Sequence, residues 1–145
     1  MENSLIGLLY PLHPKLVHFP IALMVSAMGM QALGMFFKND SWCKGAWLMF
    51  TLGLLAMPIV ILSGLLEADR LHLHHPVLNA HKLFAFWAAG ISWTALPLLW
   101  FMRHKGIRSF KIIFLIVLIS ASVLLDLAAH QGGRMVYEYG VGVSQ

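Results

Sequence analysis

Four long runs of apolar residues, separated by short polar segments, dominate this sequence. Lys15, Lys38, Lys44 and Glu67 bound the first two runs, and each run is about 20 residues long. A helix that crosses a bilayer needs about 20 mostly apolar residues. We therefore predict four membrane-spanning helices, near residues 15–37, 45–66, 82–102 and 111–131.

The composition strengthens this prediction. Of the 145 residues, 59% are hydrophobic and only 11% are charged, whereas soluble domains usually carry about 25% charged residues. A soluble enzyme and a disordered chain are both excluded. The single Cys43 excludes an internal disulfide and a cysteine-built metal site. We expect one domain over residues 1–145, an all-α integral membrane four-helix bundle. Residues 1–10 lack a basic segment, so we expect no cleavable signal there.

The distribution of charge predicts the orientation of the bundle. The two segments 38–44 and 103–111 carry most of the basic residues, with Asp40 as their only acid. The positive-inside rule places these segments in the cytoplasm. Both termini and the 67–81 segment then lie outside, in the periplasm of a bacterial cytoplasmic membrane. The basic pI is thus a topology signal, and lipid, not nucleic acid, is the expected surroundings.

Most of the eight histidines lie toward the predicted outer end. Counting about 1.5 Å per residue from the cytoplasmic boundary charges places His18, His81 and His130 within about 5 Å of one plane. His13 falls slightly outside this plane. Imidazoles from three different helices are therefore expected in one layer.

Small side chains follow two of these histidines along their helix faces. Two interpretations stay open. Small faces let membrane helices pack closely, with the histidines as hydrogen-bonding caps, or they leave a slot for a flat cofactor that the imidazoles bind. The faces, read in steps of four and three, consist of Ala22, Val25, Gly29 and Ala32 below His18, and of Ala85, Ala88, Ser92 and Ala95 below His81.

Polar residues near the same layer add to the second interpretation. Asp126 lies four residues before His130, on the same helix face. It is predicted either to accept a hydrogen bond from His130, orienting that ring, or to pair with Arg134 or Lys82. Arg70, Lys82 and Arg134 suit the propionates of a haem and equally suit a role as interfacial anchors.

A second histidine cluster lies in the segment before Pro76. His72 and His74 alternate in what we expect to be an extended segment, so their side chains would point the same way. His75 is pushed toward extended geometry by Pro76. Two or three imidazoles suit copper or zinc, although short histidine-rich loops are more often simply solvated.

Two sequence motifs resemble a known family. The opening HPKLVHFPIAL (His13 to Leu23) and the closing GGRMVYEYGVGV (Gly132 to Val143) are similar to the predicted four-helix membrane family catalogued as domain of unknown function 2231. The resemblance covers essentially the whole chain, and His81 fits the pattern. Some relatives look fused to Rieske-type or cytochrome-type modules, which implies an electron-transfer setting. His130 departs from the pattern, so any role for it is particular to this chain.

The leading hypothesis is a small membrane cytochrome that binds haem b near its outer face. His18 and His81 are the preferred axial ligands, with His130 and His13 in reserve. Two axial imidazoles leave the iron no open position, which favours electron transfer. A quinol and a periplasmic cytochrome or Rieske-type protein are the expected partners.

Two further hypotheses come from other classes. One is a copper- or zinc-binding membrane protein that uses His72, His74 and His75. The other is a cofactor-free structural or assembly subunit of a larger membrane complex. The sequence contains no P-loop, nucleophile elbow or His-Glu-x-x-His motif, so an electron-transfer or accessory subunit is favoured over a stand-alone enzyme.

Overall fold

The structure is a computed structural model that describes residues 12–141. Its regular structure in that range is entirely α-helical. The short α2 (Leu12–Leu16) precedes four long helices, which are α3 (His18–Phe36), α4 (Asp40–Arg70), α5 (Pro76–His104) and α6 (Phe110–Tyr137). The segment expected to hold no cleavable signal, residues 1–10, lies outside the described residues, as do the last two residues of the closing motif.

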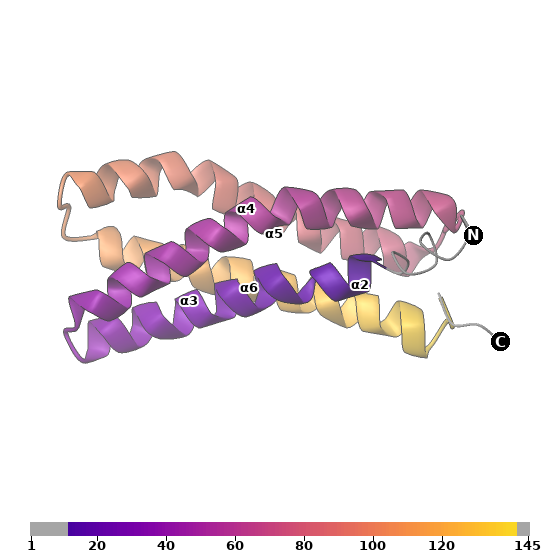
Figure 1. The fold of residues 1–145 in the computed structure, drawn as a ribbon, viewed down its shortest axis with the longest axis horizontal. Helices are drawn as coiled ribbons and strands as arrows, with labels where there is room; N and C mark the ends of the chain where they lie inside the picture. The colour runs from indigo at the N-terminus through magenta and orange to yellow at the C-terminus, as the bar shows by residue number, and fades with distance from the viewer. Residues whose placement is uncertain (1–11, 142–145) are drawn as a thin grey trace, which may run out of the picture.

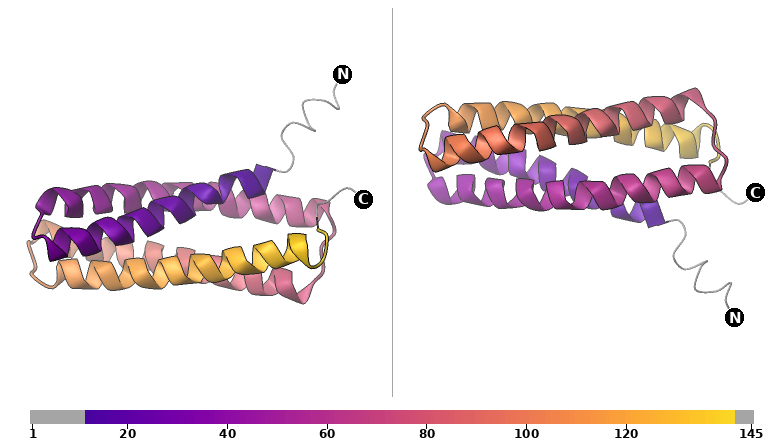
Figure 2. Two further views of the ribbon diagram at one scale, coloured as in Figure 1. Left: turned by 90° about the horizontal axis from the view of Figure 1, so that it is seen from below. Right: turned by 90° about the horizontal axis from the view of Figure 1, so that it is seen from above.

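The four long helices form two hairpins packed side by side (Figure 1). Helix α3 packs along α4, and α5 packs along α6. The hairpins meet mainly where α3 contacts α6, whereas α4 and α5 touch only sparsely. Figure 2 shows α3 and α6 together on one face of the bundle and α4 and α5 on the other. The bundle is therefore tightly closed on one side and partly open on the other.

The two ends of the bundle differ. One end carries α2, the 71–75 segment and the end of α6 (Figure 1), and we name it the terminal end. The opposite end carries the connections 37–39 and 105–109. This arrangement has the up-and-down topology predicted for four spans. The spans 45–66, 82–102 and 111–131 each lie within one long helix, and the span 15–37 corresponds to α2 and α3 together; all four segments are long and apolar enough to cross a membrane.

Helices α4, α5 and α6 extend beyond the predicted spans. Helix α4 continues through Glu67, Asp69 and Arg70, and α6 runs through Gly132 and Gly133 to Tyr137. Charged residues were taken as the limits of each span, but a helix keeps its hydrogen bonds when it leaves the hydrocarbon for the headgroup region. For these three helices the predicted boundaries therefore mark the apolar part and not the ends.

Aromatic side chains fill the core near the opposite end. Phe50 and Phe114 are completely buried, with ring centroids 5.2 Å apart and planes at 75°. Trp47 packs against both rings, 5.7 Å from Phe50 and 5.3 Å from Phe114. Edge-to-face contacts of this kind are favourable beyond the area they bury. They fix α4 against α6 at the end of the bundle opposite His13 and His81.

Candidate functional site

Two imidazoles face each other at the terminal end. His13 comes from α2 and His81 from α5, and their ring centroids lie 6.0 Å apart with perpendicular planes at 88°. The first residue belongs to the α3–α4 hairpin and the second to the α5–α6 hairpin. The pair therefore bridges the two halves of the molecule.

His13 is held by the wall of α4. Its Nδ1 atom lies 3.1 Å from the carbonyl oxygen of Val60 and 3.1 Å from the hydroxyl oxygen of Ser63. A carbonyl oxygen can only accept a hydrogen bond, so Nδ1 carries the proton. Gly64 makes room for the ring, because a Cβ atom at this position would lie 2.6 Å from Cε1 of His13.

His81 is held in the same way by α6. Its Nδ1 atom lies 2.7 Å from the carbonyl oxygen of Ala128, so this nitrogen also donates. In the neutral ring Nε2 then carries the free lone pair. An Nδ1–H group donating to a carbonyl is the usual support behind a histidine that binds metal through Nε2. Both imidazoles are thus fixed in the tautomer that suits metal binding.

A break in the first span accounts for the position of His13. Pro20 has no backbone N–H to donate to the carbonyl of Leu16, and a proline ring clashes with the carbonyl four residues before it. The helix accordingly breaks at Val17, between α2 and α3. Helix α2 contacts both α3 and α4, which brings His13 onto α4.

The other predicted ligands lie elsewhere. His18 on α3 and His130 on α6 are both exposed on the outside of the bundle. The ring that lies against His81 is that of His13. His18, the preferred partner of His81, therefore does not face it.

The predicted partners of Asp126 are not found. Asp126 is exposed on α6, and within residues 12–141 it forms no hydrogen bond or ion pair with His130, Arg134 or Lys82. Arg134 instead pairs with Glu138, with the two charged groups 3.0 Å apart. This one-turn pair on the same helix forms more readily than a contact with a residue two turns away.

The two small-residue faces have different surroundings. Below His81, Ala88 and Ser92 are buried inside the bundle. Below His18, Ala22, Val25 and Ala32 are exposed. The two faces therefore do not line one slot. Helix α3 instead buries another face, with Met24, Ala27 and Gln31 inside the bundle.

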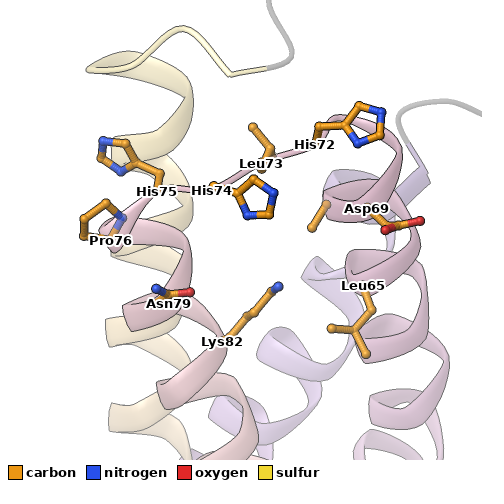
Figure 3. Close-up of a pocket in the computed structure, with 10 residues that line it drawn as sticks. Leu65, Asp69, His72, Leu73, His74, His75, Pro76, Asn79 and Lys82 are labelled. Carbon is orange, nitrogen blue, oxygen red and sulfur yellow. The ribbon is translucent and has the colours of Figure 1, made fainter.

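A cavity of about 500 Å³ opens at the terminal end between α4 and α5. In Figure 3 the Lys82 side chain points into it and the His74 ring lies above it. Two of its lining residues are sequence neighbours of residues at the imidazole pair: Lys82 directly follows His81, and Leu65 directly follows Gly64, which contacts His13. Its lining consists of Leu65, Ala68, Asp69, His72, Leu73, His74, His75, Pro76, Asn79 and Lys82.

The three imidazoles of the segment above this cavity do not converge on one point (Figure 3). The prediction that His72 and His74 point the same way from an extended strand is wrong, because His72 has a left-handed backbone (φ 47°). It ends α4 in a Schellman turn, in which Leu73 N–H donates to Ala68 and His72 N–H donates to Asp69. The three rings diverge in Figure 3. Within the described residues no group of three or more His, Cys, Asp or Glu side chains is placed to hold a metal ion.

His75 has a structural role in this segment. Its Nδ1 atom accepts a hydrogen bond from the backbone N–H of Val77 at 3.2 Å, which caps the first turn of α5. Its ring packs against Tyr139, with centroids 4.3 Å apart. A nitrogen used for capping is not available to a metal.

Glu67 was missed as a site residue in the sequence, where it marked only the end of a span. One of its carboxylate oxygens is buried and has no hydrogen-bond partner in the described structure. Its charge lies close enough to act on His13. The only sequence feature that could have indicated this role is that Glu67 follows Gly64 by about one helical turn near the end of the span.

The fold and the four apolar helices define the class of this protein, which is a multi-pass helical membrane protein built as a four-helix bundle. Residues 9–145 match the family model described as "Predicted membrane protein (DUF2231)", and the chain belongs to that family. No curated protein and no solved structure matches the chain.

Proposed function

We propose that this protein is a small membrane b-type cytochrome whose haem is bound by His13 and His81. The observation that carries the proposal is the pair of opposed imidazoles from separate hairpins. Two metal–nitrogen bonds of about 2 Å, together with the distance from each nitrogen to its ring centre, amount to about 6 Å. The observed separation of the ring centroids is 6.0 Å.

The residues around the pair fit this role. The carbonyls of Val60 and Ala128 accept hydrogen bonds from Nδ1 of the two rings and keep Nε2 of each ring as the ligating atom. Lys82, which follows His81 in the sequence, points into the cavity between α4 and α5 and would supply a cation for a propionate. Arg134, already paired with Glu138, is less suited to that task. A haem held by His13 and His81 would supply reversible one-electron transfer.

The position of the site suggests its partners. The pair and the cavity lie at the terminal end, which the charge distribution orients toward the periplasm of a bacterial cytoplasmic membrane. A quinol in the bilayer and a periplasmic cytochrome or Rieske-type protein are the partners for a relay at this depth. The chain then acts as an electron-transfer subunit.

An absorption spectrum with a pyridine-hemochrome assay tests the haem proposal. Protein expressed with a haem supply is expected to show a Soret band, and His13→Ala or His81→Ala should abolish it. His18→Ala and His130→Ala are matched controls, because both residues are exposed histidines from the same end. A wild-type protein that folds without a Soret band overturns the proposal and favours the cofactor-free subunit.

The proposed orientation has its own test. Alkaline phosphatase fused after residue 145 is expected to be active, and green fluorescent protein at the same position is expected to be dark. A fusion after Gly106, in the basic connection between α5 and α6, should give the reverse result. The opposite pattern would place the histidine pair on the cytoplasmic side.

A further inference from the structure

Helices α3 and α6 together form one face of the bundle (Figure 2), and this face carries an acidic residue inside the predicted span 111–131. Asp126 lies eight residues before Arg134, which is about 12 Å along the helix from that boundary charge. Its side chain is exposed and has no hydrogen-bond or ionic partner among residues 12–141. An ionisable residue that faces hydrocarbon alone costs on the order of 2–3 kcal/mol.

Further polar groups lie on the same face. His130 follows Asp126 by one turn on α6, and His18 is exposed on the neighbouring α3. Both imidazoles lie within about one to one and a half helical turns of Asp126 in depth. A carboxyl group and an imidazole are complementary hydrogen-bonding partners in either charge state. The face therefore carries a carboxyl group and imidazoles that could form a hydrogen bond, but that form none with each other within the single chain.

The shapes of the two helices are also complementary. The middle of the exposed side of α3 is narrow, with Ala22 and Ala32 exposed and space around Gly29 for an added Cβ atom, although bulky Phe19 and Phe36 flank it at the two ends. The exposed side of α6 carries the branched Ile119 and Val123. Close packing of bulky side chains against small ones is the main source of helix association in lipid.

We propose that the α3–α6 face binds a second copy of this chain. In a two-fold arrangement about the membrane normal, α3 of each copy lies against α6 of the other, and each Asp126 meets imidazoles of its neighbour. A self-complementary face is the requirement for such a dimer. The same chain supplies the acid, the imidazoles, the bulky side and the small side, which argues for a second copy over an unrelated helix.

Cysteine crosslinking in membranes tests the location of the interface. The single Cys43 is first replaced by Ser. Val25→Cys on α3 of one copy, co-expressed with Val123→Cys on α6 of another, is then expected to give a disulfide-linked dimer on oxidation, because the two exposed positions lie at about the same depth. Ile59→Cys on α4, co-expressed with the same Val123→Cys chain, is the matched control, because it is exposed at a similar depth on the other face. Equal crosslinking of the two combinations, or a Val25→Cys product that contains a different protein, would overturn the proposal.

Sedimentation equilibrium in detergent tests the role of the carboxyl group. Asp126→Leu is expected to raise the dimer dissociation constant about tenfold or more, because two interhelical hydrogen bonds are lost. Asp69→Leu removes an exposed carboxylate outside this face and should leave the constant unchanged. An undiminished Asp126→Leu dimer contradicts the pairing. The proposal does not depend on haem, since the face is separate from His13 and His81.

Discussion

Backbone carbonyls decide which ring nitrogen His13 and His81 present to each other. Each Nδ1 atom donates to a helix carbonyl on a neighbouring element, and a carbonyl cannot exchange roles with the ring. The two Nε2 atoms are therefore left with the same chemistry, although they come from unrelated parts of the chain. A pair of histidines that only capped the bundle would not need the same tautomer.

Glycine at position 64 is required for this arrangement. In Gly64→Ala the new Cβ would lie 2.6 Å from Cε1 of His13, so the ring must move. Overpacking of this kind costs about 1–3 kcal/mol, and we expect haem to bind about ten- to a hundredfold more weakly. Titration of the apoprotein with haem, followed at the Soret band, measures the effect.

Gly132→Ala is the matched control for this prediction. A Cβ at position 132 would lie 3.5 Å from Nδ1 of His81, which is an ordinary contact, and alanine favours a helix over glycine. We expect binding close to wild type in this variant. Equal losses in the two variants would mean that helix packing, and not the His13 ring, is the sensitive feature.

The sequence predicts His81 as a candidate ligand, but it does not predict which imidazole lies against it. The depth estimate assumed a straight helix through residues 15–37, which ranked His18 first. Pro20 interrupts the helical hydrogen bonds at Val17, so His13 lies on the separate short helix α2 and contacts α4. The sequence analysis also used small residues to predict which face of the first span points into the bundle. In lipid such residues pack against any neighbouring helix, so they do not identify the inside of one bundle.

The turns that end the helices can be recognised from the sequence only where they contain a glycine. Gly106 and Gly140 have positive φ values, as do Lys38 and His72. The hydrogen bonds after α3, α4 and α5 have the same Schellman pattern. Glycine indicates such a turn directly, whereas Lys38 and His72 give no signal. This is why the 71–75 segment was expected to be extended.

Replacing His72 by glycine tests this account of the end of α4. His72→Gly removes the steric cost of a left-handed residue, so we expect the protein to be stabilised by about 1 kcal/mol. Thermal unfolding followed by circular dichroism measures the change. Gly106→Ala is the opposite control, since it places a Cβ at φ 66° and should destabilise by a similar amount.

The same variant separates two of the functional hypotheses. If His72 only ends a helix, His72→Gly retains any haem and any bound metal. A loss of bound copper or zinc in His72→Gly, measured by elemental analysis, would instead restore the 72–75 segment as a metal site.

The sequence predicts the topology of the two hairpins, but it does not predict which of their helices contact each other closely. Four apolar runs with short connections lead to an up-and-down bundle. They do not say that α3–α6 is the closed side and α4–α5 the open one. That difference depends on side chains distant in sequence, such as Gln31, which is buried and donates to the carbonyl of Lys111 at 3.1 Å. The pattern of apolar and polar residues along one helix does not predict such a contact with another helix.

The proposed haem site should require both hairpins at once, because His13 belongs to the first and His81 to the second. Cutting the chain between Leu73 and His74 leaves the Schellman turn of α4 and the His75 cap of α5 intact. We expect co-expressed fragments 1–73 and 74–145 to copurify through the α3–α6 contact and to show the Soret band together. Neither fragment alone has two opposed imidazoles, so each should lack it. A Soret band from one fragment alone would place both ligands in a single hairpin and contradict the site.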